Sequence, residues 1–272
     1  MVFRLHIPAY PLNMFIESFI YYRDYQPVHT VDRFLPDGQV NVVFDLTDYP
    51  KYIYDNNTLQ EIQACRNVWF SGIRTTYITI PSGRDSEMFV INFHKGKAYP
   101  FMEMPMCELT DSVVDAELVL SPQILNLREL LLSTPEIARK FWVAEQYLMR
   151  HFGDRLVPNP FIDFAVNSIL KLPDVVTVDE ISRRVGYSQK HLISLFKEHV
   201  GITPKAFMRV MRFQKAIRDI EQCRQINWAQ FATASGYYDQ AHFINDFRSF
   251  SGFTPAQYVA SKNDQLNYVP VG

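Results

Sequence analysis

Short runs of apolar and β-branched residues, each bounded by turn residues, fill the first 120 residues of the chain. The clearest of these runs are residues 40–46, 67–70, 76–80 and 88–93. Pro36-Asp37-Gly38 leads into the first run, and Pro81-Ser82-Gly83 ends the third. Short strands at regular intervals with turns between them are typical of a β-sandwich or a β-barrel. The pattern therefore predicts a β-rich unit in this part of the chain.

The hydrophobic spacing becomes helical after this β-rich part. Leucines are dense over residues 125–132, and apolar residues recur every three or four positions over residues 137–148. Pro158-Asn159-Pro160 then interrupts the pattern, and short helical patterns follow it. We therefore predict two domains: a β-rich unit with helices at its C-terminal side over residues 1–157, and an all-α unit over residues 161–272.

One block of residues occurs twice in the second predicted domain. The first copy contains Gly186-Tyr187, His191-Leu192, Phe196-Lys197 and Thr203-Pro204, and the second contains Gly236-Tyr237, His242-Phe243, Phe247-Arg248 and Thr254-Pro255. The two glycines are 50 positions apart and the two histidines are 51 apart, so the copies differ by one residue inserted in the second turn. Two copies are too few for a solenoid. A duplicated small module is the simpler interpretation.

Each copy has the pattern of a helix-turn-helix. Residues 177–180 and 227–230 begin with Thr or Asn and end with Glu or Gln, which is the spacing of a capping box at the start of a helix. Gly186 and Gly236 then allow the sharp backbone turn between two helices. The second helix of each pair follows this turn and is expected to stop at the next glycine. One face of it is apolar, and the other carries hydrogen-bonding side chains suited to base edges and phosphates.

Net charge separates the two predicted domains. The whole chain has 27 basic and 29 acidic residues, a formal charge of −2. Residues 1–173 hold 15 basic and 20 acidic residues, which gives −5, whereas residues 174–272 hold 12 and 9, which gives +3. A helical pair with a glycine turn is common in all-α proteins and does not by itself predict DNA binding. Its duplication within the basic part of the chain favours a nucleic-acid partner.

The second copy carries a motif that fixes many residue types over a long span: Gly236-Tyr237, His242-Phe243, Phe247-Arg248, Gly252, Thr254-Pro255 and Tyr258. With this motif, residues 161–261 resemble the DNA-binding domain of AraC/XylS-type bacterial transcriptional regulators. The resemblance implies two helix-turn-helix units joined by a long helix, here over about residues 205–223. Ser182, Ala241 and Val259 stand where the family more often has alanine, serine and arginine.

The first domain more faintly resembles the sensor domains attached to such regulators. The similar residues are Phe34-Leu35-Pro36-Asp37-Gly38, Phe93-His94-Lys95-Gly96 and Cys107-Glu108-Leu109-Thr110-Asp111. This resemblance implies a cupin-like β-barrel followed by helices, so that the expected fold class of the chain is α+β. It also implies a sequence-specific DNA-binding transcription regulator, whose first domain senses a small-molecule effector of unknown identity or mediates dimerisation. RNA polymerase is a further partner that the resemblance implies.

Carried over to this sequence, the family's base-contacting positions are Lys190, Ile193 and Ser194 in the first recognition helix and Gln240, Ala241, His242, Ile244 and Asn245 in the second. The expected phosphate contacts fall at Lys197, Lys205, Thr203, Arg248 and Thr254, through side chains or the backbone amides beside them. Lysine donates to the acceptors of guanine, and glutamine or asparagine pairs with adenine.

Two other functions fit parts of the sequence. A barrel that holds a metal through His6, His29 and His94 with Asp45 or Glu87 would be a metal-dependent enzyme fused to a helical interaction module. No His-x-His pair, nucleophile elbow, phosphate-binding glycine loop or His-Glu-x-x-His motif supports this alternative. In the second alternative the duplicated helices bind other proteins, but their polar faces favour DNA. We therefore expect a regulator, not an enzyme, with no metal or cofactor.

Cysteine usage and hydropathy bear on location and assembly. Cys65, Cys107 and Cys223 are too widely spaced for a disulfide framework or a Cys-x-x-Cys metal site. No secretory signal is evident and no apolar run reaches about 18 residues, so we expect a soluble cytoplasmic protein. The leucine and aromatic stripes over residues 122–151 predict a homodimer, with packing of these helices on the barrel as the alternative.

Overall fold

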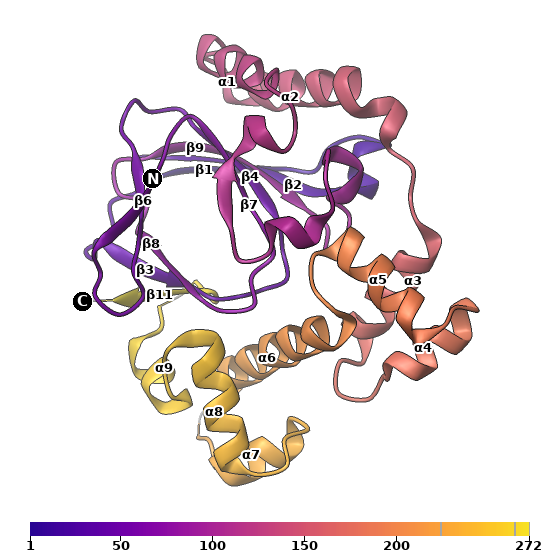
Figure 1. Ribbon diagram of the computed structural model, residues 1–272. Helices are drawn as coiled ribbons and strands as arrows, with labels where there is room; N and C mark the ends of the chain where they lie inside the picture. The colour runs from indigo at the N-terminus through magenta and orange to yellow at the C-terminus, as the bar shows by residue number, and fades with distance from the viewer. Residues whose placement is uncertain (224, 264, 272) are drawn as a thin grey trace.

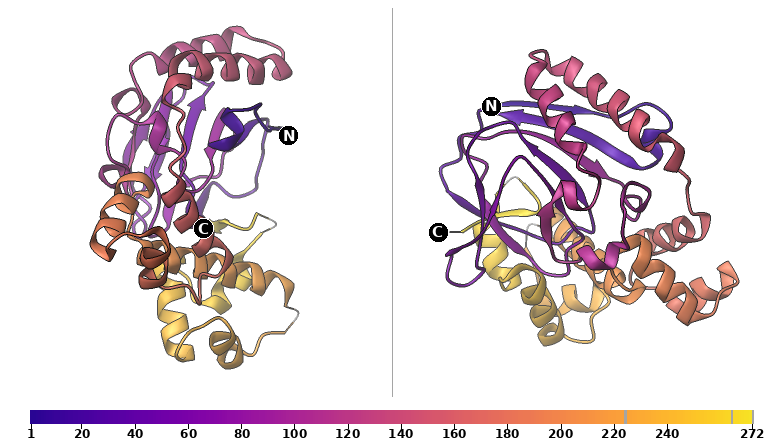
Figure 2. Two further views of the ribbon diagram at one scale, coloured as in Figure 1. Left: turned by 90° about the vertical axis from the view of Figure 1, so that its right-hand side faces the viewer. Right: turned by 45° about the horizontal axis from the view of Figure 1, so that its top comes forward.

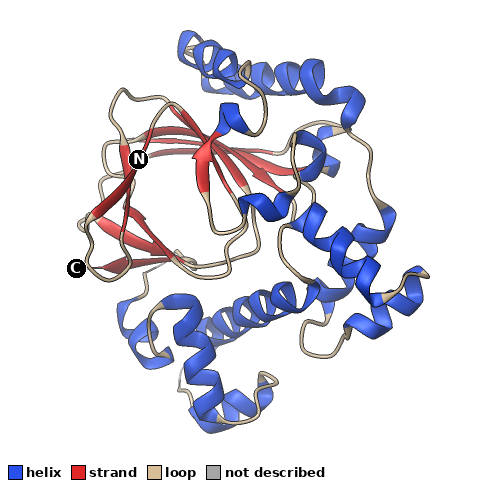
Figure 3. Cartoon of the chain, in the orientation of Figure 1, coloured by secondary structure: helices blue, strands red, loops and turns tan. Residues whose placement is uncertain are grey.

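Two antiparallel β-sheets and two groups of helices make up the computed structural model, which describes residues 1–223, 225–263 and 265–271 (Figures 1 and 3). The first sheet has the order β1-β2-β9-β4-β7-β10 and consists of Val2–His6 (β1), Ile16–Arg23 (β2), Glu87–Phe93 (β9), Asn41–Asp45 (β4), Val68–Ser71 (β7) and Val113–Asp115 (β10). The second sheet has the order β11-β3-β8-β5-β6 and consists of Tyr268–Val271 (β11), Val31–Phe34 (β3), Ile78–Pro81 (β8), Lys51–Tyr54 (β5) and Glu61–Cys65 (β6). Together the sheets curve into an open, barrel-like unit (Figure 1).

The apolar runs identified in the sequence do form strands. β4, β7, β8 and β9 each overlap one of the four predicted runs, and all the sheet pairings are antiparallel. Phe44, Phe70 and Phe89 are fully buried on the face of the first sheet that the following helices cover. The prediction of a β-rich unit followed by helices in an α+β fold is therefore confirmed.

Two helices, α1 (Ile124–Ser133) and α2 (Ile137–Phe152), lie across the outer face of the first sheet (Figure 1). Leu127 and Leu131 of α1 are fully buried, and the ring of Phe141 on α2 lies 5.7 Å from that of Phe89 on β9. One apolar stripe of each helix therefore packs on the barrel, as the alternative interpretation of these stripes expected.

Seven helices follow, and they contain the repeat. They are α3 (Pro160–Lys171), α4 (Val178–Val185), α5 (Gln189–Val200), α6 (Pro204–Gln222), α7 (Trp228–Ala234), α8 (Gln240–Ser251) and α9 (Pro255–Ser261). The pairs α4–α5 and α7–α8 are the two copies, and α6 is the long helix between them, close to its predicted bounds. Seen from two further sides, these helices lie against one end of the barrel-like unit (Figure 2).

The chain returns to the sheets after α9. β11 pairs antiparallel with β3, so that Val269 faces Arg33 in the register. The predicted all-α character of residues 161–272 is therefore corrected at Tyr268–Val271, because β3 offers a backbone edge that these residues complete. The boundary in the connector stays a prediction: α2 ends at Phe152 and α3 begins at Pro160.

One continuous cluster of buried apolar side chains extends from the first sheet into both helical groups. Backbone also approaches closely between them: a Cβ at Gly201, which has φ = +103°, would lie 2.7 Å from the Ile73 side chain. Within the described ranges, no helix is both long and apolar enough to cross a membrane.

Candidate nucleic-acid interface

The first helix-turn-helix, α4–α5, is built by local hydrogen bonds that its sequence encodes. The Thr177 hydroxyl accepts from the Glu180 amide (3.1 Å), and the Ser188 hydroxyl accepts from the His191 amide (3.2 Å). Gly186 adopts the left-handed conformation (φ = +74°) that the turn requires. The predicted capping box is only half formed, because the Glu180 carboxylate pairs instead with Arg184 at 2.6 Å.

The second unit, α7–α8, uses the same devices with different residues. Asn227 caps α7 by accepting from the amides of residues 229 and 230, both at 3.2 Å. Gly236 has φ = +77°, and the Asp239 carboxylate caps α8 by accepting from the His242 amide at 2.7 Å. A complete capping box instead starts α9, where Thr254 and Gln257 each accept from the other's backbone amide. Both recognition helices thus begin and end where the sequence predicted.

Two buried or half-buried carboxylates fasten the units to α6. Asp174, just before the first unit, pairs with Lys215 and lies 3.8 Å from Arg212. Asp246 on α8 pairs with Arg209 and accepts from the Tyr237 hydroxyl at 3.2 Å. Burial, helped by the Asp246 charge, raises the pKa of Tyr237, so its hydroxyl stays protonated as a donor. No sequence pattern predicted the roles of Asp174 and Asp246, because an isolated acidic residue belongs to no motif.

The predicted base-contacting side chains lie on the faces of α5 and α8 that are turned to solvent. Lys190, Ser194, Gln240, Ala241, His242 and Asn245 are exposed, whereas Ile193 and Ile244 are half-buried. The two isoleucines face partly inward because their helical neighbours on that side, Leu192 and Phe243, belong to the core. The six exposed residues therefore form two separate polar faces, one for each unit.

The predicted phosphate contacts differ among themselves. Lys197, Lys205 and Arg248 are exposed, and none forms an ion pair with another residue of the described chain. The hydroxyls of Thr203 and Thr254 already cap α6 and α9 by accepting from backbone amides (3.1 and 3.3 Å). At Thr203 and Thr254, an anion would therefore be bound by the backbone amides at the start of the helix and not by the threonine hydroxyl.

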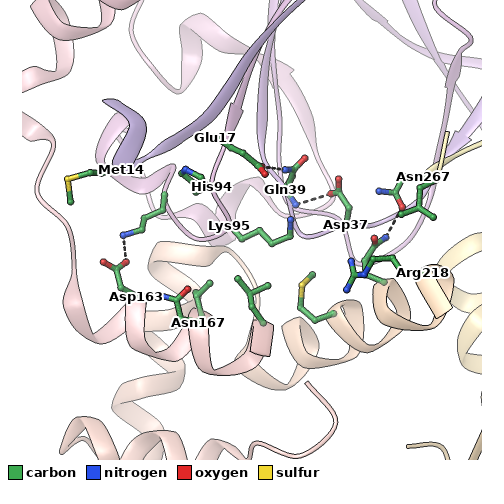
Figure 4. A pocket seen from close by; sticks show the side chains of 16 residues that line it. Met14, Glu17, Asp37, Gln39, His94, Lys95, Asp163, Asn167, Arg218 and Asn267 are labelled. Atoms are coloured by element: carbon green, nitrogen blue, oxygen red, sulfur yellow. Dashed lines mark hydrogen bonds and ion pairs between the residues drawn. The ribbon is translucent and has the colours of Figure 1, made fainter. Parts of the chain in front are cut away.

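A cavity of about 570 Å³ lies between the barrel-like unit and helices α3 and α6 (Figure 4). Its charged side chains are Glu17, Asp37, Lys95, Lys97, Asp163 and Arg218. Lys97 pairs with Asp163, whereas Lys95 and Arg218 have no ion-pair partner among the described residues. Burial raises the pKa of the Asp37 carboxyl, partly offset by the Gln39 amide and the Lys95 charge. Asp37, His94 and Lys95 belong to the two segments that resemble sensor domains, but no sequence pattern joined them to the other walls, because these come from residues as distant as 14 and 267.

The histidines considered for a metal site lie apart. His6 pairs with Glu145 of α2 (2.6 Å), His29 with Asp32 (2.9 Å), and His94 contacts the Asn13 carbonyl (3.2 Å). In the part of the chain that the structure describes, no group of three or more His, Cys, Asp or Glu residues is placed to hold a metal ion.

Two family models match separate parts of the chain. A helix-turn-helix domain family matches residues 181–261, and a domain family of unknown function (DUF6597) matches residues 4–115. An uncharacterized HTH-type transcriptional regulator of Haemophilus influenzae is 29% identical over 31% of this chain and 28% of its own length. The HTH-type regulator YbfI of Bacillus subtilis is 31% identical over 50% of this chain and 48% of its own. The chain thus spans less than half the length of these two relatives.

Other similar proteins match the second domain or the fold. PqrA of Proteus vulgaris, a probable transcription factor, is 28% identical over 34% of this chain and 81% of its own length. ToxT of Vibrio cholerae aligns over 96% of this chain and 98% of its own, at 9% identity and a TM-score of 0.45. An AraC-type DNA-binding domain protein of Chromobacterium violaceum aligns over 39% of this chain and 94% of its own, at 24% identity and a TM-score of 0.36. Residues 181–261 thus match a helix-turn-helix domain family, and the curated relatives are named as transcriptional regulators, as the resemblance to AraC/XylS-type regulators implies.

Proposed function

We propose that this protein is a sequence-specific DNA-binding transcription regulator. The observation that carries the proposal is the pair of exposed polar faces on α5 and α8, each beside unpaired basic side chains. α4 and α7 project away from the sheets, so the barrel-like unit does not cover the starts of the recognition helices (Figure 1). Such a surface suits two contacts with the major groove. The bacterial relatives named as transcriptional regulators support the same role.

The test is selection of DNA fragments from a random duplex library by the purified full chain, followed by a salt titration on the selected site. With Lys197, Lys205 and Arg248 at phosphates, log K should fall against log salt with a slope of about −3 or steeper. Failure to select any sequence, or retention that does not depend on salt, would favour a protein-binding role for the helices.

We also propose that the cavity between the barrel-like unit and α6 holds the effector. Four side-chain amides and charged side chains of both signs line the cavity, which favours a small polar ligand. Lys95 and Arg218 would contact an anionic group of that ligand. The cavity touches both the first domain and the helix that joins the two helix-turn-helix units. A molecule bound there would therefore contact the parts that a sensor must connect.

Native mass spectrometry of the full chain tests the effector proposal. We expect a small-molecule adduct that Arg218→Gln loses and that Arg150→Gln, an exposed change on α2 away from the cavity, keeps. The proposal fails if the native protein carries no adduct and its melting temperature does not respond to a panel of small carboxylates, amino acids and sugars.

We also propose how this regulator assembles and with what it works. α1 and α2 leave Leu130, Leu132 and Trp142 exposed on the side away from the sheet, and we infer that this face joins two copies. Light scattering at micromolar concentration should give a dimer that Trp142→Glu converts to a monomer. We further propose RNA polymerase as a partner and the cytoplasm as the location, because a regulator of bacterial transcription acts there.

A further inference from the structure

The strand β11 is attached to the barrel-like unit by more than its sheet pairing. Val269 is fully buried, the Leu35 amide donates to the Asn267 carbonyl (2.9 Å), and the rings of Phe34 and Tyr268 lie 5.0 Å apart. β11 has β3 as its one neighbour, so β3 would be an open sheet edge without it.

The same strand β3 also holds the second helix-turn-helix. The Arg33 guanidinium lies between the rings of Tyr77 (4.7 Å) and Phe253 (4.5 Å), and Phe253 follows directly on the C-terminal end of α8. Nearby, the Thr76 hydroxyl donates to the Ser249 carbonyl at 3.1 Å. A Cβ at Gly252 would lie 2.6 Å from the Arg33 guanidinium, so the end of α8 rests directly on β3.

The helix α6 joins this arrangement through one buried amide. The Gln214 side chain, 3% exposed, donates to the Pro36 carbonyl (2.9 Å) and to the Asn267 side-chain oxygen (2.8 Å). The Tyr258 hydroxyl of α9 donates to the Leu266 carbonyl at 3.0 Å. Gln214 therefore links the connecting helix, the loop after β3 and the segment before β11.

The first helix-turn-helix is held by a different part of the barrel-like unit. The Thr110 hydroxyl donates to the Gly201 carbonyl, and the Tyr99 hydroxyl donates to Glu198, both at 2.7 Å. These contacts fix the C-terminal end of α5. Besides their shared attachment to α6, the two recognition helices thus have separate supports on the barrel-like unit, so one of these supports can be removed while the other stays.

We propose that residues 266–271 are a tether that positions the second recognition helix relative to the first, with Val269 in the tether and Gln214 on α6 as the positioning residues. The proposal rests on the proposed function and adds to it a role for a segment outside the helix-turn-helix domain. All base-contacting candidates of α8 are exposed or half-buried while the tether is docked, so docking does not block them. Docking instead fixes their orientation, and a site with fixed orientation loses less conformational entropy on binding.

The experiment compares Val269→Asp and Gln214→Leu with the control Gln265→Asp, an exposed change that adds the same charge as Val269→Asp one residue before the tether. Each full-length variant binds the complete selected site and a duplex that keeps only the half contacted by the first unit. We expect both tether variants to bind the complete site about tenfold more weakly, with the half-site unchanged, while Gln265→Asp and Val269→Ile behave as the original chain.

Hydrogen exchange of the Leu35 amide reports release of the strand. Val269→Asp should lose protection there, and a chain that ends at Leu266 gives the same release by deletion. Equal affinity of the released chain for the complete site, tighter binding, or equal losses on both duplexes would overturn the tether. Failure of the original chain to select any DNA would instead overturn the proposed function.

Discussion

Lys190 and Lys197 lie on the same recognition helix, two turns apart, and carry the same charge. Lys190 is in the first turn of α5, where side chains of a docked helix contact base edges. Lys197 is near the C-terminal end of α5, where we expect side chains to contact DNA phosphates. Lys190→Ala should therefore change the preferred base at one position, at about 1–3 kcal/mol of discrimination, whereas Lys197→Ala should weaken all sites alike. Binding to a panel of base-substituted sites measures both. A uniform loss for Lys190→Ala would contradict its assignment.

The cysteines differ in a way that labelling can measure. Burial raises the pKa of the Cys65 thiol to about 11, and its side chain is 3% exposed, whereas Cys223 is exposed. The thiolate is the reactive form, so at pH 8 an alkylating reagent should modify Cys223 in the native protein and Cys65 only after denaturation. Mass spectrometry of digested samples with and without denaturant gives the two rates. Fast native labelling of Cys65 would show that the second sheet opens.

At the scale of single residues, the sequence predicted helix-capping side chains more reliably than it predicted contacts between residues that are distant in the chain. Thr177 caps α4 as expected, and Ser188 and Asp239 cap α5 and α8 in the same way, because each partner lies three residues away in the chain. Glu180 turns to Arg184 instead of the cap, since an i,i+4 pair of opposite charge competes for it. Asp174 and Asp246 acquire their roles from partners about 40 residues away, which no local pattern encodes.

Among the elements, Asp246 holds α8 against α6. Asp246→Ala leaves the Tyr237 hydroxyl and Arg209 without their acceptor, and the hydroxyl lies in a buried site. Because Arg209 is 48% exposed, most of the cost should come from the buried hydroxyl, about 1–3 kcal/mol of unfolding free energy. The matched control Glu180→Ala breaks an exposed pair and should cost less than about 1 kcal/mol. Urea unfolding of both variants measures the difference, and equal costs would contradict the holding role.

Helices and strands were predictable to different degrees. The limits of α5 and α8 follow from local signals, since glycines and capping residues mark them in the sequence, whereas those of α6 were implied by the family resemblance. β11 could not be predicted, because four residues carry no clear period and its partner β3 lies more than 230 positions earlier. In β3 only Asp32 is buried, and the polar side chains of Asp32 and Arg33 are explained by their contacts with His29, Tyr77 and Phe253.

For the whole molecule, charge asymmetry between the halves indicated a nucleic-acid partner, but no sequence pattern indicated how the two halves pack together. The cavity combines Lys95 from the loop after β9 with Arg218 from α6, and the tether combines Asn267 with Gln214. These combinations depend on the packing of the helices against one end of the barrel-like unit (Figure 2). Long-range packing therefore decides the cavity and the tether, whereas local pattern decides the two helix-turn-helix units.

The arrangement of both recognition helices on one connecting helix predicts the layout of the DNA site. Successive major-groove segments on one face of DNA lie about 34–36 Å, or about 10 bp, apart. α6 holds the two units through Asp174 and Asp246, so a monomer should contact two such segments without a palindrome. If the rigid pair spans less than one turn, the duplex must bend, at about 1–6 kcal/mol depending on the steps between the segments. We therefore expect a non-palindromic site with flexible or A·T-rich sequence between its halves.

Hydroxyl-radical footprinting should give two protected patches one turn apart on the same face for each bound monomer. A single patch per monomer would show that only one helix-turn-helix enters a groove, and the second copy would then need another role.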